Sequence, residues 1–453
     1  MSGILSIPPL NEGSKKRGFL MNKFRRCFRI ALFVGFVLLA FLGLAKEKIE
    51  LTWWGFQEPN LRLFQEAAQL FNQTRDDVEI VFKGTVYPYE EMHDKLMMAA
   101  LSGVGSPDLC NVEIGKLGFF LRGSTIPFYD VSDVVEPYEN ELLKLRTDLY
   151  TFEGKLYGIP THVAAGFIFY NTALFEELGL DPDDIVTWDD FIEMGKKITR
   201  DKDGDGKIDV WMTDVEINDL HMLIGLSKQR GGGIYDKDGN LLIDSQANID
   251  ALQFYQDLVY KYEIATVCPG GFHHDPSFFA WCNSGKVASV IMPQWFVTRF
   301  TDMMPDLAGK MIIRPLPAVT EGGKRSYMSG GTCTTITKQI DPKKIPIVKE
   351  FLVFAKVTYE ANVRIAEIGF DPWRRDVYDD PRVMAPNAYF RNEPILETVK
   401  VLLDSDGIPS DYIGPLYPEV LELYRESIPF RAIVNREDPE KILKEAGRQI
   451  RSN

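Results

Sequence analysis

The alternation of strand and helix patterns from residue 49 to residue 112 restricts the fold more than any other feature of this chain. Apolar and polar residues alternate from Ile49 to Trp53, which predicts a half-buried strand, and apolar residues then recur at helical spacing from Asn60. The two patterns continue as a strand, a helix and a strand at 78–82, 89–101 and 109–112. This order favours a parallel α/β sheet, whose strands bring their carboxyl ends to one edge, where ligands bind.

The rest of the chain continues the mixed pattern. Further strands are predicted at 167–170, 287–292, 311–314 and 332–337, with several long helices after the first of them. From Pro342 onward the pattern is mostly helical. No internal repeat or low-complexity stretch interrupts the sequence, so we expect one continuous globular α/β assembly.

The acidic balance of charge excludes one class of partner. The 453 residues include 65 acidic and 51 basic side chains, a formal net charge of −14. A nucleic-acid-binding protein needs basic surface to displace phosphate counterions, so we expect no nucleic acid partner. With 45% apolar and 26% charged residues, the composition is that of a soluble globular protein, and the length suits two or three folding units.

The first 45 residues differ in charge from the rest. They hold seven basic residues and one acid, a charge of +6, which leaves −20 for the remainder. The basic cluster is followed by sixteen uncharged residues, Ile30 to Ala45. This is the pattern of a secretory signal peptide, and a tilted segment of this length would also serve as an N-terminal anchor. Either way, we expect an exported protein, in the periplasm or on the outer face of the cytoplasmic membrane.

Four cysteines lie outside this leader, at positions 110, 268, 282 and 333. They are too few for a disulfide scaffold in a chain of this length. Cys268 and Cys282 would either pair across a short loop or remain as buried free thiols. His273 and His274 lie between them, but the spacing C-x4-H-H-x7-C matches no common structural zinc pattern.

An acidic loop offers side-chain oxygens at the spacing of an EF-hand calcium loop. The oxygens at positions 1, 3, 5 and 9 belong to Asp201, Asp203, Asp205 and Asp209. Gly206 occupies position 6, but Met212 stands at position 12 in place of a bidentate glutamate, so Asp214 or water would have to complete the set. The alternative is a polar turn between a helix and the next strand. The turn is the favoured interpretation, and we expect no cofactor; a calcium ion, if the loop binds one, would have a structural role.

Several short motifs occur in an order that resembles one family. The most specific succession is Tyr157-Gly158-Ile159-Pro160, Phe169 to Phe175, and Thr187-Trp188-Asp189-Asp190-Phe191. The others are Ser106-Pro107-Asp108, Gly231 to Asp236, Gly285 to Trp295, and Gly369 to Arg375. In this order they resemble the extracellular solute-binding proteins of ABC importers, specifically the sugar-binding family that includes maltose-binding protein. The resemblance runs from about Ile49 to the C-terminus.

The resemblance implies a periplasmic-binding-protein-like fold, with two α/β lobes joined by a hinge that the chain crosses several times. The lobes would comprise residues 46–160 with 315–368, and 161–314 with 369–453. It further implies a non-enzymatic, monomeric receptor that binds a sugar or oligosaccharide in the cleft and delivers it to the membrane subunits of an ABC permease. Two alternatives stay open: the same fold with a polyamine, a metal chelate or a sugar phosphate, and a secreted glycoside hydrolase, which needs paired carboxylates around an aromatic cleft.

Candidate ligand contacts follow from the chemistry of sugars, whose flat C–H faces and ring of hydroxyls require aromatic planes and directional polar groups. Trp53 and Trp54 are adjacent in a strand and face opposite sides, and alternation assigns Trp53 to the core. The cleft candidates are then Trp54, Gln57 and Glu58. Glu113 follows the third predicted strand, at a carboxyl end where this family tends to place polar ligand contacts.

Two further candidates come from the resemblance. Trp295 stands where similar proteins stack a pyranose ring. His162 stands where maltose-binding protein has an acidic ligand contact, and a neutral imidazole suits a pair of hydroxyls because it both donates and accepts hydrogen bonds. Gly330 and Gly331 would let the backbone approach the ligand, or form a turn. The aromatic candidates that would also suit a hydrophobic core are Trp211, Tyr412 and Tyr417.

Overall fold

A computed structural model describes residue 3, residues 46–122 and residues 125–452. The leader predicted for residues 1–45, with its Cys27, lies outside the described residues. The described residues divide into two compact units, one that includes residues 46–50 and 69–81 and one that includes residues 51–68, 82–122 and 125–452. In the part that the structure describes, no helix is both long and apolar enough to cross a membrane.

The smaller unit has internal bonds of its own. The backbone N–H of Glu47 donates to the carbonyl of Asp77 at 2.8 Å. The side chain of Asn72 donates to the carbonyl of Ile80 at 2.9 Å and accepts from its N–H at 2.7 Å. These bonds join the first residues of one strand, the end of a helix and the start of the next strand.

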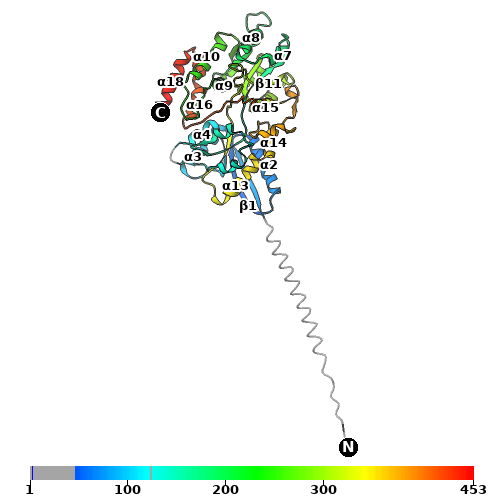
Figure 1. Cartoon of the computed structure of the whole chain (residues 1–453), viewed down its shortest axis with the longest axis vertical. Helices are drawn as coiled ribbons and strands as arrows, with labels where there is room; N and C mark the ends of the chain where they lie inside the picture. Colours follow the sequence, from blue (N-terminus) through cyan, green and yellow to red (C-terminus); the bar gives the residue numbers. More distant parts are fainter. Residues whose placement is uncertain (1–2, 4–45, 123–124, 453) are drawn as a thin grey trace. The chain divides into compact units, whose positions relative to one another are not determined.

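The regular elements follow the predicted order (Figure 1). The strands are β1 (Glu47–Gly55), β2 (Val78–Val86), β3 (Leu109–Glu113), β4 (Thr151–Phe152), β5 (Lys155–Leu156), β6 (Ile159–Pro160), β7 (Gly166–Asn171), β8 (Thr213–Val215), β9 (Ala265–Val267), β10 (Ser289–Pro293), β11 (Met311–Arg314), β12 (Thr332–Ile336), β13 (Pro386–Asn387) and β14 (Glu393–Pro394). The α-helices are α2 (Glu58–Gln73), α3 (Tyr89–Ser102), α4 (Ile114–Phe120), α5 (Ser132–Val135), α6 (Lys144–Thr147), α7 (Thr172–Glu176), α8 (Trp188–Ile198), α9 (His221–Gln229), α10 (Gln246–Tyr260), α11 (Pro276–Asn283), α12 (Val297–Met303), α13 (Ile345–Leu352), α14 (Tyr359–Glu367), α15 (Glu397–Asp404), α16 (Tyr417–Glu426), α17 (Ile428–Ile433) and α18 (Pro439–Ser452). Every strand predicted from the hydrophobic pattern is present.

The main sheet has the strand order β2-β1-β3-β12-β6. β1 and β3 are parallel, with Trp53 opposite Leu109, so the prediction of parallel strands in the first βαβα segment is confirmed for this pair. β12 runs antiparallel to both β3 and β6, which makes the sheet mixed. β12 returns from more than 200 residues downstream and lies beside β3, so the Gly330-Gly331 turn that precedes it reaches the carboxyl end of β3.

Burial along β1 agrees with the predicted alternation. The side chain of Trp53 is fully buried, and its Nε1 donates to Oδ1 of Asn111 at 3.2 Å. Trp54 faces the other side, is half-buried and packs edge-on against Tyr87 at 5.5 Å between ring centroids. The assignment of Trp53 to the core is therefore confirmed.

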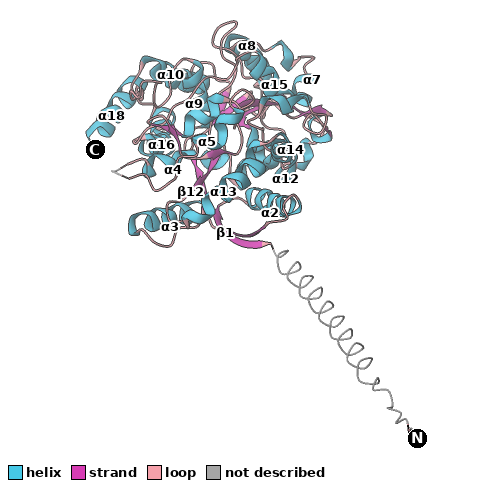
Figure 2. Cartoon of the chain, turned by 60° about the horizontal axis from the view of Figure 1, so that its bottom comes forward, coloured by secondary structure: helices cyan, strands magenta, loops and turns pink. Residues whose placement is uncertain are grey.

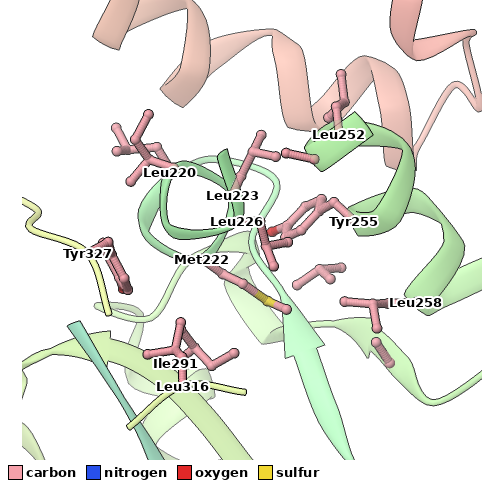
Figure 3. Packing of buried hydrophobic residues seen from close by; sticks show 14 of the residues in the cluster. Leu220, Met222, Leu223, Leu226, Leu252, Tyr255, Leu258, Ile291, Leu316 and Tyr327 are labelled. Atoms are coloured by element: carbon pink, nitrogen blue, oxygen red, sulfur yellow. The ribbon is translucent and has the colours of Figure 1, made fainter. Parts of the chain in front are cut away.

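A second sheet, β10-β7-β11, contributes side chains to a large hydrophobic cluster, and helices lie around these strands (Figure 2). Figure 3 shows side chains of α9, among them Leu223 and Leu226, between Tyr255 of α10 and Ile291 of β10. Every residue of α9 from His221 to Lys228 is buried. The helix is therefore an internal element, and its first residue is held in place by packing on several sides.

Capping explains where α8 begins. The Thr187 side chain accepts from the N–H of Asp190, and the Asp190 carboxylate accepts from the N–H of Thr187, a reciprocal capping box. Asp189 and Asp190 lie in the first turn and Lys196 and Lys197 in the last, which suits the helix dipole. The local sequence therefore determines this boundary.

The alternatives for the cysteines are settled by the described residues. Cys110, Cys268, Cys282 and Cys333 are all free and buried. Cys268 and Cys282 form no disulfide, so their interpretation as buried thiols is the one that holds.

Asp371 gives the first testable prediction. It is fully buried and accepts from the backbone N–H groups of Ala164 at 3.0 Å and Ala165 at 2.8 Å, and it thereby supports Ala164 in a left-handed conformation (φ 58°). Burial raises the pKa of Asp371 from 3.8 to about 7, against the opposing effect of those N–H donors. Between these two values the folded state retains a proton that the unfolded state has lost, so the free energy of unfolding is expected to fall as pH rises.

Between pH 4 and pH 7 the free energy of unfolding of the wild type should fall by about 3 kcal/mol more than that of Asp371→Asn, whose side chain does not titrate. Urea unfolding of both proteins at several pH values measures it. Parallel pH profiles for the two proteins would contradict the prediction.

Candidate functional site

The carboxyl end of β3 places Glu113 in a buried polar position. Its Oε2 accepts from the N–H of Gly115 at 2.7 Å, which caps α4, and from the hydroxyl of Tyr89 at 2.9 Å. Burial raises the pKa of Glu113, and Arg425 and these two hydrogen bonds oppose the shift. A carboxylate held in this way is oriented before any ligand arrives.

The Gly330-Gly331 turn brings Trp295 to the same place. Both glycines have positive φ, 70° and 99°, which favours glycine at these positions. A Cβ atom on Gly330 would lie 3.5 Å from Nε1 of Trp295 and 3.9 Å from Oε1 of Glu113. The structure therefore unites three predicted site residues, Glu113, Trp295 and Gly330, although they are widely separated in the sequence.

Neighbouring groups hold the indole of Trp295 in one orientation. Its Nε1 donates to the carbonyl of Ser329 at 3.1 Å. The ring of His274 is parallel to it at 5.7 Å between centroids, and the ring of His221 meets it edge-on at 5.2 Å. Burial lowers the pKa of His274 to about 4, so this imidazole is neutral near pH 7. The half-buried indole is thus a fixed aromatic plane.

A charged group completes the polar side of the site. Nε2 of His221 lies 3.5 Å from Oδ2 of Asp219, and its Nδ1 lies 3.0 Å from the hydroxyl of Ser329. Burial opposes protonation of His221, but Asp219 outweighs it and raises the pKa of the imidazole. Nε of Arg425 lies 3.7 Å from Oδ1 of Asp219. Burial would lower the pKa of Arg425, but the carboxylates of Glu113 and Asp219 raise it.

We call these residues the Trp295 site; its members are Tyr89, Glu113, Asp219, His221, Trp295, Gly330 and Arg425. A cavity of about 320 Å³ adjoins it and is lined in part by Gly115, Lys116, Leu421 and Arg425. Two larger cavities, of about 490 and 600 Å³, contain no member of the site. The site is the better candidate for ligand binding because it combines a fixed aromatic plane with oriented polar groups.

Tyr89, Asp219, His221 and Arg425 did not emerge from the sequence. Tyr89 lies three residues after β2, and Glu113 is the last residue of β3, so the position of Tyr89 just beyond a strand end is the signal that could have identified it. His221 is the first residue of α9, and polar residues at the start of a helix are reasonable candidates for ligand contacts. Arg425 lies in the last turns of α16, and no local signal marks it.

Trp54 lies on β1, and Gln57 and Glu58 follow this strand. Their neighbour Phe56 connects this segment to the Trp295 site. Phe56 packs edge-on against Tyr89 at 5.1 Å, and Tyr89 binds Glu113. Gln57 follows Phe56 and accepts from the side chain of Asn60 at 2.8 Å. Glu58 is exposed at the start of α2, and Trp54 packs on Tyr87. Their contact with a ligand stays a prediction.

His162 lies in a buried setting. Its ring stacks on Phe370 at 4.6 Å, and neither ring nitrogen has a hydrogen-bond partner among the described residues. Burial, with Arg146 and Lys356 nearby, holds its pKa well below the usual value. The neutral imidazole expected from the sequence is therefore supported. Contact of His162 with a ligand stays a prediction.

The remaining aromatic candidates, Trp211, Tyr412 and Tyr417, are partly or fully buried. Tyr417 is buried in the large hydrophobic cluster, where burial and the Glu113 carboxylate raise its pKa, and Tyr412 packs against the same cluster. Trp211 is half-buried and pairs through its backbone with Lys286 and Ala288. Tyr417 also interacts electrostatically with Glu113 and Arg425 of the Trp295 site. Contact of Trp211, Tyr412 and Tyr417 with a ligand stays a prediction.

The acidic loop has hydrogen bonds of its own, which decide neither for the polar turn nor for calcium. Asp201 accepts from the N–H groups of Gly204 and Gly206, both at 2.7 Å, and Asp209 accepts from Lys202 at 2.8 Å. Oxygens of Asp201, Asp203 and Asp209 lie within 4.8 Å of one another, whereas Asp205 accepts from Lys207. Asp214 is buried beside Cys268 and His273, in a different cluster. Calcium binding by this loop stays a prediction, without Asp214.

The fold and the Trp295 site define an α/β binding protein, with an aromatic plane and polar groups gathered at the edge of a mixed sheet. A family model described as bacterial extracellular solute-binding protein matches residues 57–356. The chain belongs to this family.

Curated relatives cover nearly the whole chain. It is 39% identical over 411 residues to the arabinooligosaccharide-binding protein of Halalkalibacterium halodurans, covering 89% of each chain. It is 35% identical over 444 residues to the arabinooligosaccharide-binding protein of Bacillus subtilis, covering 95% of this chain and all of the relative. The predicted class, a solute-binding component of an ABC transporter, is confirmed, and the family and these relatives are binding proteins.

Solved structures agree on the fold. The maltose-bound MalE3 of T. maritima has a TM-score of 0.67 at 22% identity and covers 89% of this chain and 99% of its own. A Listeria monocytogenes substrate-binding protein in complex with cycloalternan has a TM-score of 0.68 at 18% identity, covering 90% and 99%. The predicted periplasmic-binding-protein-like fold is confirmed.

Proposed function

We propose that this protein binds oligosaccharides of arabinose outside the cytoplasmic membrane and delivers them to an ABC permease. The observation that carries the proposal is the 39% and 35% identity, along almost the full length, to two arabinooligosaccharide-binding proteins. The protein would act as a monomeric, non-enzymatic receptor in the periplasm or on the outer face of the membrane, with the membrane subunits of the permease as its partners.

The chemistry of the Trp295 site supports an uncharged ligand rich in hydroxyls. Its carboxylates are compensated, since Glu113 faces Arg425 and Asp219 faces both His221 and Arg425. A polyamine would require unpaired carboxylates and a sugar phosphate would require unpaired cations. Paired acceptors and donors beside an aromatic plane suit the hydroxyls and the C–H face of a sugar.

Contacts between the predicted lobes support closure around the ligand. In this proposal residues 46–160 with 315–368 form one lobe, and residues 161–314 with 369–453 form the other. Arg122 of the first lobe donates to the carbonyl of Pro415 at 2.7 Å and pairs with Glu419 of the second. These exposed contacts would open when the lobes separate and would re-form on the liganded protein.

Titration calorimetry with arabinobiose to arabinopentaose tests the ligand. We expect dissociation constants of about 1 μM or below for at least one arabino-oligosaccharide, which corresponds to about −8 kcal/mol. Maltotriose and galactobiose should bind at least about 100-fold more weakly. The recovered oligosaccharide should be intact, because the proposed role is binding.

Tight binding of another sugar, with none of the arabinose series, would retain the receptor and overturn the choice of ligand. Turnover of an arabinoside that stops when one carboxylate is replaced would favour the hydrolase instead.

A further inference from the structure

Four metal-binding side chains converge behind the Trp295 site. Asp214 lies in β8 and Glu216 directly follows that strand, two residues on and therefore on the same side. β9 runs parallel to β8, with Val215 opposite Val267, and Cys268 follows β9. His273 lies five residues further, where its backbone N–H donates to Oε1 of Glu216 at 3.1 Å. Two adjacent strand ends and one turn thus supply the whole set.

The four side chains lie close together and are shielded from solvent. One ligand atom each of Asp214, Cys268 and His273 lies within 4.8 Å of the other two. Nε2 of His273 pairs with Oδ2 of Asp214, and Nδ1 lies 3.4 Å from Oε1 of Glu216. All four residues are only 1–2% exposed. Thiolate, imidazole and carboxylate are the ligands that zinc prefers in proteins, and three of them meet here.

The described protein atoms alone leave this cluster incompletely satisfied. Oδ1 of Asp214, Oε2 of Glu216 and Nδ1 of His273 are buried without a hydrogen-bond partner in the described part of the chain. Each buried polar atom without a partner destabilises the fold. A divalent cation at Nε2 of His273 would engage the Asp214 carboxylate and leave Nδ1 as an N–H donor toward Glu216. It would also compensate the two carboxylates, which one imidazole cannot do fully.

We propose that Asp214, Cys268 and Nε2 of His273 bind one Zn²⁺ ion with a structural role and with water as its fourth ligand. Glu216, 3.4 Å from Nδ1 of His273, orients the imidazole from its other side. The ion joins the ends of β8 and β9 to the turn that carries His274, and His274 stacks on Trp295. Zinc therefore stabilises the wall that holds the aromatic plane of the ligand site. The proposal concerns this wall and is independent of which sugar binds.

The cluster differs from the set Cys268, His273, His274 and Cys282, whose spacing in the sequence matches no common zinc pattern. Cys282 is buried and free but does not belong to the cluster. His274 belongs to a second group with Asp219 and His221, which is less buried and whose Asp219 already faces His221 and Arg425. Cys282 therefore serves as a matched control for Cys268.

Metal exchange on the full chain tests the proposal. The protein is unfolded with a chelator, refolded with Zn²⁺ or Co²⁺, and dialysed before its metal content is measured. We expect one zinc ion per chain, a higher midpoint of thermal unfolding than for the metal-free protein, and a thiolate-to-cobalt charge-transfer band in the Co²⁺ form. Cys268→Ser should abolish the band and weaken zinc binding at least about 10-fold, whereas Cys282→Ser should retain both.

Several outcomes would overturn the proposal. These are a wild-type protein that retains no zinc, a cobalt form without the thiolate band, and a band that survives Cys268→Ser or disappears in Cys282→Ser. If Cys268→Ser does not fold, the cobalt spectrum of the wild-type protein and of Cys282→Ser still decides the matter. Sugar binding is measured separately, so failure of the zinc site leaves the proposed ligand untouched, and the reverse also holds.

Discussion

Replacing Trp295 with alanine is expected to weaken oligosaccharide binding by about 30-fold or more, the effect of losing about 2 kcal/mol at a central aromatic contact. The indole is the aromatic plane of the site, and Ser329, His274 and His221 fix its orientation before the ligand arrives. A plane fixed in this way loses little conformational entropy on binding, so most of the stacking energy contributes to affinity. Calorimetry with the tightest arabino-oligosaccharide measures the change.

Two matched variants separate stacking from other effects. Trp295→Phe keeps an aromatic plane but loses the Nε1 donor to Ser329, so we expect an affinity between those of the wild type and Trp295→Ala. Trp281 is also half-buried and packs on Phe278 at 6.2 Å, outside the site. Trp281→Ala should bind within about two-fold of the wild type. Wild-type affinity in Trp295→Ala, with unchanged circular dichroism, would remove Trp295 from the ligand site.

The order of elements could be predicted because hydrophobic periodicity is a local property. The repeats that begin at Ile49 and Asn60 reappear as β1 and α2, and the later strands fall within a few residues of their expected places. Glu113 and Gly330 could also be proposed, because both lie next to strand ends and such ends meet at one edge of a sheet. This reasoning requires no knowledge of distant contacts.

The other polar members of the site could not be predicted, because their positions depend on tertiary packing. Arg425 lies on α16, where a charged residue resembles any solvated position of an amphipathic helix. His221 opens α9, and only the burial of this helix brings it to Trp295. Outside the site, the polar side chain of His162 predicts an exposed position. The ring of Phe370, about 200 residues away in the sequence, stacks on it and buries it. Asp214, a ligand of the proposed zinc ion, lies more than fifty residues before Cys268, a separation much longer than the short spacings typical of structural zinc ligands.

Replacing Asp411 with alanine is expected to give the largest loss of stability, about 3–5 kcal/mol, because it leaves a buried lysine unpaired. Lys228 and Asp411 are both about 4% exposed and form a direct ion pair. Lys228 is near the end of α9, the helix between α10 and β10, so the pair anchors the segment before α16 to the core. Urea unfolding monitored by tryptophan fluorescence measures the change in the free energy of unfolding.

Burial lowers the pKa of Lys228, so in Asp411→Ala the unpaired amine is expected to lose its proton on folding. The unfolded state then binds more protons than the folded state, and the variant should regain stability as pH rises from 6 to 9. The double variant Lys228→Met with Asp411→Asn removes both charges and should recover all but about 1–2 kcal/mol. Lys444→Ala, which breaks the exposed pair with Glu440, should cost less than about 0.5 kcal/mol. An Asp411→Ala protein as stable as Lys444→Ala would show that the buried pair does not anchor α9.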